Sequence, residues 1–164
     1  RRQLAWNFRK PLIIMSPKSL LRHPKCISPL DQFTTDNSFQ EILINASDEK
    51  KSNRILFCSG QVYYDLLQRR EDQKIVDCTI VRLEQLYPFP ENQIAEIIKK
   101  NPKAKKAWVQ EEPLNMGAAG YIKARWNYDP LTFVTRPASA SPAVGFKKVH
   151  DKQLIELMDQ AFGF

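Results

Sequence analysis

Short apolar runs alternate with amphipathic segments over the last two thirds of the chain. Four runs are typical of strands buried on both faces, at residues 54–59, 78–83, 107–110 and 131–135. Apolar positions at helical spacing follow each run, at residues 62–67, 90–98, 117–126 and 154–162. Strands that alternate with helices of this length favour right-handed crossovers. The pattern therefore predicts an α/β fold with a mostly parallel, doubly wound sheet.

The first third of the chain has a different pattern. The apolar run from Leu12 to Met15, closed by Ser16-Pro17, predicts one buried strand whose sheet partners are missing. Residues 25–53 are polar, and only residues 39–44 interrupt them, which indicates a linker with a possible edge strand. Because the chain starts with arginine, we expect it to be a piece of a longer protein. The expected organisation is residues 1–24, a linker at 25–53 and a domain at 54–164.

Composition excludes several classes of function. The net charge of +7 is spread over scattered lysine pairs without a nucleic-acid-binding motif, so we expect no nucleic-acid partner. No apolar run is long enough to cross a bilayer, and we expect no membrane partner. Cys58 and Cys78 lie inside apolar runs, which predicts core packing in a reducing compartment. Neither His23 nor His150 has a second ligand at metal-binding spacing, so no metal site is expected.

The carboxyl ends of parallel strands are where such sheets bind ligands. Glu111 and Glu112 come at one of these ends, but adjacent carboxylates of an extended segment point opposite ways and make a poor acid–base pair. We expect Glu111, Glu112 and Asn115 to serve an interdomain or subunit contact. The chain has no Gly-x-Ser-x-Gly turn and no complete dinucleotide-binding glycine pattern.

Basic residues near the strand ends suggest a second kind of site. Ser59-Gly60 opens a predicted helix, and Arg82, Arg136 and Lys147 fall near other strand ends. If these groups converge on one crevice, they could bind the phosphates of coenzyme A or an adenine nucleotide. The alternative for the small-residue loop at 136–145 is a rigid connector.

Five segments, in this order, resemble one enzyme family over the whole chain: MSPKSLLRHP (15–24), FCSGQVYYDL (57–66), RLEQLYPFP (82–90), EEPLNMG (111–117) and RPASASPAVG (136–145). Together they are similar to the C-terminal end of the thiamine diphosphate-dependent first component of 2-oxoglutarate dehydrogenase. The resemblance implies a transketolase-type C-terminal domain from about residue 53, preceded by the last strand of a pyrimidine-binding domain.

The resemblance also implies what the whole enzyme does. In that family the enzyme is a homodimer that decarboxylates 2-oxoglutarate and passes succinyl to the lipoyl arm of the second, succinyltransferase component. Thiamine diphosphate and Mg²⁺ bind in upstream domains, so we expect this chain to hold neither and to supply no catalytic residue. The form of the 136–145 loop favours a bacterial cytoplasm, or the mitochondrial matrix if the source is eukaryotic. Two alternatives stay open, a regulatory module for acetyl-coenzyme A or adenine nucleotide and a paralogue that acts on 2-oxoadipate.

Overall fold

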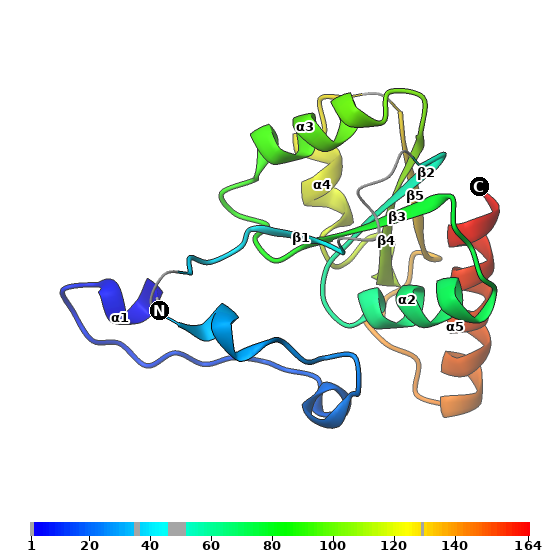
Figure 1. Ribbon diagram of the computed structural model, residues 1–164. Helices are drawn as coiled ribbons and strands as arrows, with labels where there is room; N and C mark the ends of the chain where they lie inside the picture. The colour runs from blue at the N-terminus through cyan, green and yellow to red at the C-terminus, as the bar shows by residue number, and fades with distance from the viewer. Residues whose placement is uncertain (1, 35–36, 46–51, 129) are drawn as a thin grey trace. The chain divides into compact units, whose positions relative to one another are not determined.

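The computed structural model describes residues 2–34, 37–45, 52–128 and 130–164 (Figure 1). The chain divides into two compact units, Arg1–Gln40 and Glu41–Phe164. The first unit contains the short helix α1 (Arg2–Ala5) and two 3₁₀ turns, η1 (Lys18–Arg22) and η2 (Leu30–Phe33), joined by extended segments.

The strand predicted at residues 12–15 is absent from the described part of the first unit. These residues are extended but pair with no other strand, and their side chains are exposed, up to 91% for Met15. A strand needs a neighbour for its backbone hydrogen bonds, and Pro11 and Pro17 on either side lack an N–H donor. An apolar run therefore indicates side chains that need to be covered by other residues, but it does not by itself form a strand of a sheet.

A five-stranded sheet forms the centre of the second unit. Its strands are β1 (Ile42–Ile44), β2 (Arg54–Cys58), β3 (Cys78–Leu83), β4 (Lys105–Pro113) and β5 (Leu131–Arg136), in the spatial order β1-β3-β2-β4-β5. Strands β2 to β5 are parallel, and β1 pairs antiparallel with β3 at one edge. The predicted mostly parallel sheet is confirmed, and β1 lies in residues 39–44, where the sequence indicated a possible edge strand. Because β1 belongs to the sheet, the compact unit begins at Glu41 rather than at residue 54.

Helices cover both faces of this sheet, with α3 (Glu91–Lys100) and α4 (Ala119–Arg125) on one face and α2 (Val62–Asp72) and α5 (Lys147–Gly163) on the other (Figure 1). On the first face Phe57, Val81 and Trp108 pack with residues of α3 and α4 in one apolar cluster. Leu56 and Ile80 alternate with these residues along their strands, so they point to the opposite face and are also fully buried. This alternation explains why the central strands are apolar throughout.

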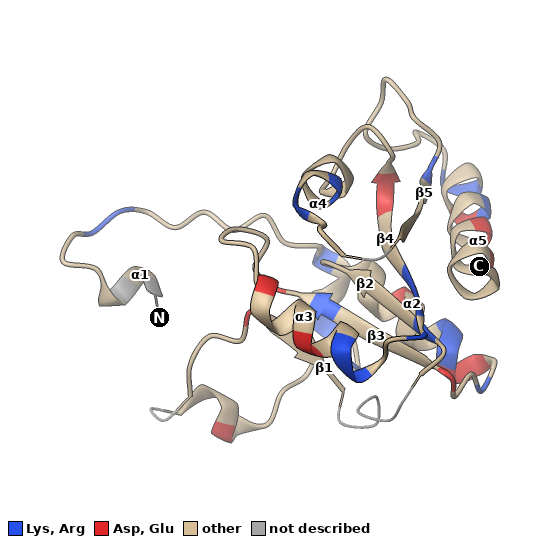
Figure 2. Ribbon diagram, turned by 90° about the horizontal axis from the view of Figure 1, so that it is seen from above, with Lys and Arg blue, Asp and Glu red and all other residues tan. Residues whose placement is uncertain are grey.

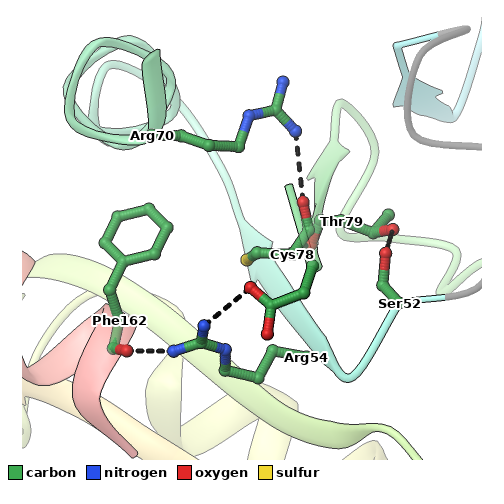
Figure 3. Close-up of polar contacts among 7 residues, drawn as sticks. Ser52, Arg54, Arg70, Cys78, Thr79 and Phe162 are labelled. Carbon is green, nitrogen blue, oxygen red and sulfur yellow. Dashed lines mark hydrogen bonds and ion pairs between the residues drawn. The ribbon is translucent and has the colours of Figure 1, made fainter. Parts of the chain in front are cut away.

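Polar contacts join the amino ends of β2 and β3 to the end of α5 (Figure 3). The Arg54 guanidinium donates to Asp77 Oδ1 at 2.8 Å and to the backbone oxygen of Phe162. The hydrogen bond from Arg54 holds the pKa of the Asp77 carboxyl below its usual value. Ser52 and Thr79 share a hydroxyl hydrogen bond of 2.7 Å beside this ion pair. Arg54 and Asp77 therefore have structural partners at this end of the sheet.

Candidate functional site

The direction of winding reverses between β2 and β4. The chain first places β3 on one side of β2 and then crosses to place β4 on the other side. The loops that leave β2 and β4 diverge at such a switch point and leave a crevice beyond the carboxyl ends of the strands. A cavity of about 430 Å³ occupies this place. This switch-point cavity is lined by residues that include Gly60, Tyr87, Trp108, Gln110, Glu112 and Tyr121.

Gln110 organises the wall of the switch-point cavity. Its side chain is only 3% exposed, and its Oε1 accepts a 2.9 Å hydrogen bond from the indole N–H of Trp108. Its Nε2 donates to the backbone oxygens of Met116 at 2.7 Å and of Pro113 at 3.1 Å. One buried amide thus satisfies the Trp108 donor and closes the turn between β4 and α4.

Gly117 is required in this turn for two reasons. Its backbone has a φ of +62°, which side chains other than hydrogen disfavour. A Cβ at this position would stand 3.0 Å from Gln110 Nε2 and from Glu112 Cδ. The turn therefore packs directly against the Gln110 amide, and Glu112 is held beside it at the rim of the cavity.

The three residues expected at a domain or subunit contact have different surroundings. Glu112 lines the switch-point cavity, and Glu111 is half-buried beside it on the strand. Asn115 is exposed and forms two hydrogen bonds with the backbone of Ser139, from its Nδ2 to the oxygen at 2.9 Å and from the Ser139 N–H to its Oδ1 at 3.0 Å. Asn115 therefore joins the β4–α4 turn to the 136–145 loop, and the contact with another domain or subunit stays a prediction.

A second cavity, of about 400 Å³, lies between the 136–145 loop and the start of α5. This loop pocket is lined by residues that include Arg136, Ala138, Ser139, Phe146, Val149 and Gln153. Arg136 ends β5 and is only 7% exposed. One of its terminal nitrogens, Nη2, lies 2.9 Å from His150 Nδ1. Since a guanidinium can only donate, Nδ1 of His150 is the acceptor in this contact.

The five residues of the predicted phosphate crevice do not line a common pocket. Ser59 and Gly60 line the switch-point cavity, whereas Arg136 lines the loop pocket. The guanidinium of Arg82 packs 4.4 Å from the centre of the Tyr63 ring and forms an ion pair with Glu84. Lys147 is 85% exposed and pairs with Asp151 on the next turn of α5. Figure 2 shows lysine and arginine positions spread over helices α3, α4 and α5 and over strands of the sheet, so the positive charge is dispersed.

Among the parts of the chain that the structure describes, no helix is long and apolar enough to span a membrane. Within the same residues, no three histidine, cysteine, aspartate or glutamate side chains are grouped so that they could hold a metal ion. Cys58 and Cys78 are buried in the sheet as predicted, and Cys26 is exposed. Burial raises the pKa of the Cys58 thiol far above its usual value, with a smaller opposing effect of Arg82.

Comparison with known proteins identifies the family. The family model for the C-terminal region of 2-oxoglutarate dehydrogenase matches residues 27–162. The chain belongs to this family. It is 43% identical to the 2-oxoglutarate dehydrogenase E1 component of Rickettsia typhi, over 99% of the chain. It is 41% identical to the component of the same name from Haemophilus influenzae over 100% of the chain, and 38% identical to that of Brucella anthropi over 99%. In each case the chain spans 18% of the relative's length.

The 2-oxoglutarate dehydrogenase C-terminal domain seen here has site residues that the sequence pattern did not reveal. The pattern predicts only a strand at Trp108 and Gln110, and it gives no reason to select Tyr87 or Tyr121. A polar residue at the end of the apolar run Ala107–Val109 is the signal that could have marked Gln110 as a buried hydrogen-bonding residue. Tyr121 gave no such signal, although its hydroxyl is buried without a hydrogen-bond partner among the described residues.

Proposed function

We propose that this chain is the C-terminal domain of the E1 component of a 2-oxoglutarate dehydrogenase complex, and that it completes the enzyme by packing. The observation that carries the proposal is the 38–43% identity to E1 components along nearly the whole chain. The enzyme would be a thiamine diphosphate-dependent homodimer that decarboxylates 2-oxoglutarate and passes succinyl to the lipoyl arm of the succinyltransferase component. In bacteria, the group to which these three relatives belong, the cytoplasm would be its compartment.

Exposed apolar side chains in the first unit support a packing role. Leu12, Ile13, Ile14 and Met15 are 63–91% exposed, and other large apolar residues of this unit are also exposed. Consecutive large apolar side chains with this exposure are typical of a segment on which another part of a protein docks. In the proposed enzyme, neighbouring domains cover this segment, and Glu112 and Asn115 contribute to a contact at the carboxyl end of the sheet.

We assign no catalytic step to this chain. Thiamine diphosphate would supply the carbanion chemistry of decarboxylation when bound. The resemblance implies that a Gly-Asp-Gly segment would hold Mg²⁺ and the diphosphate, and the 164 residues contain no such segment. The residues described do not fit the cofactor, so the role proposed for them is to support domains that bind it.

A chimeric enzyme tests the proposal. The matched C-terminal segment of the Haemophilus influenzae E1 component is replaced with this chain, and 2-oxoglutarate-dependent reduction of ferricyanide is measured. We expect a dimeric, active chimera, and no activity from the same enzyme without any C-terminal segment. A chimera that forms a folded dimer but leaves 2-oxoglutarate unreacted would contradict the proposal.

The same assay, with 2-oxoadipate as the substrate, tests the alternative of a 2-oxoadipate paralogue. Substrate choice in the family is expected to depend on upstream residues, so the chimera should keep the preference of its Haemophilus part. A gain of 2-oxoadipate activity on replacing only this segment would show that the chain itself carries substrate specificity and would favour the paralogue. Calorimetry of the 164-residue chain with thiamine diphosphate should show no binding, and micromolar affinity would contradict the packing role.

A further inference from the structure

We propose that the loop pocket is a binding site for the phosphate group of a small organic phosphate, with Arg136 as its main donor. The proposal is independent of the enzyme assigned above. It also replaces the single crevice expected from the sequence, because Arg136 is the only one of the predicted arginines that lines this pocket.

Arg136 is a buried cation without a buried anion. It is 7% exposed, and no aspartate or glutamate among the described residues forms an ion pair with it. Its Nε is buried and has no hydrogen-bond partner, while its Nη2 donates to Nδ1 of His150. A buried charge normally needs a paired charge and full hydrogen bonding, because desolvation costs several kcal/mol. The missing partner is therefore an anion that enters the pocket.

The start of α5 adds a second attraction for an anion at the same pocket. Gly145 and Phe146 come directly before this helix, Val149 lies in its first turn, and all three line the pocket with Arg136. No side chain caps the helix, and its first turn contains no acidic residue. A 17-residue helix presents free N–H groups and a partial positive charge at such an end. Lys147 and Lys148 extend the positive potential into solvent, although Asp151 pairs with Lys147 and offsets part of it.

The other lining residues indicate an organic body attached to the phosphate. A volume of about 400 Å³ is much larger than inorganic phosphate needs. Its walls include Pro137, Ala138, Pro142 and Val144, which offer apolar contact. Gln153 also lines the pocket and adds a polar side chain to its wall.

Titration of the 164-residue chain with phenyl phosphate tests the site, with benzoate and inorganic phosphate as comparison probes. The readout is the ¹H–¹⁵N spectrum, which includes the arginine Nε–H signals. We expect saturable shifts of the Arg136 Nε–H signal and of the amides of residues 145–149. Phenyl phosphate, with two negative charges and an apolar ring, should bind at least about tenfold more tightly than either comparison probe. Equal affinity for benzoate, or shifts confined to other residues, would overturn the proposal.

Two variants and one control separate binding from folding. Arg136→Lys keeps the charge but removes the fork of donors, and should weaken phenyl phosphate at least about tenfold. Gln153→Glu places a carboxylate on the same pocket, where it can pair with Arg136, so it should abolish binding without lowering the melting temperature. Arg125→Lys makes the same chemical change at an exposed site on α4 and should leave affinity unchanged. If Arg136→Lys fails to fold, retention of binding by Gln153→Glu still refutes the site.

Discussion

The hydrogen-bonding role of Gln110 gives a prediction whose size can be worked out from the structure. Replacement by methionine keeps nearly the same volume, so no large cavity opens. The change leaves the indole N–H of Trp108 unpaired on a side chain that is 1% exposed. An unmade hydrogen bond of a buried donor costs about 1–3 kcal/mol. The lost bonds to the Met116 and Pro113 oxygens add about 0.5–1.5 kcal/mol each, part of which water restores because Met116 is half-buried.

We therefore expect Gln110→Met to lower the free energy of unfolding by about 2–4 kcal/mol. With a slope near 2 kcal/mol/M, the urea midpoint should fall by about 1–2 M, which equilibrium unfolding followed by tryptophan fluorescence can measure. The matched control is Gln68→Met, which removes one exposed hydrogen bond to Asp72 and should change stability by less than about 0.5 kcal/mol. A loss below about 1 kcal/mol in Gln110→Met would refute the view that this amide holds the turn.

Three further predictions concern the turn, the ion pair and the thiols. Gly117→Ala should destabilise the chain by about 1–3 kcal/mol, because φ is positive and the new Cβ would stand 3.0 Å from Gln110 and Glu112. The control is Gly120→Ala in helix α4, where the new Cβ would have no atom within 4 Å. It should be neutral or stabilising by up to about 1 kcal/mol in the same urea assay. Asp77 has a folded pKa below its unfolded value, so its contribution is present above about pH 4 and is lost as the pH falls through the folded pKa. Between about pH 5 and 3 the wild type should therefore lose more stability than Asp77→Asn. The difference between the two losses should be less than about 1 kcal/mol, because this carboxylate is partly exposed. Equal losses would contradict the ion pair. Ellman's reagent should label Cys26 quickly in the native chain and the buried Cys58 only after unfolding, and rapid labelling of Cys58 would mean that the sheet opens.

The candidate site was less accessible to sequence reasoning than the fold. The sequence pattern indicated Ser59, Gly60, Glu112 and Arg136, and each of them lines a cavity. Their grouping was not foreseeable, because it depends on the faces and strands from which the side chains extend. Arg82 illustrates this, since it lies at a strand end as expected but turns onto aromatic rings of α2 and onto Glu84.

The sequence by itself determined the order of strands and helices in the second unit and its α/β class. Buried parallel strands must be apolar on both faces and their helices on one, and these periods are visible in the letters from residue 54 onward. Its motifs also indicated the family. The sequence predicts a strand at residues 12–15 whose sheet partners are missing, and the tertiary structure adds that these residues pair with no strand of the described chain and expose their side chains. The tertiary structure also decided that Arg136 lies buried beside a cavity, without an acidic partner among the described residues. Burial and pairing depend on residues such as His150 and Gln153, which only the packing of α5 on the sheet brings close to Arg136.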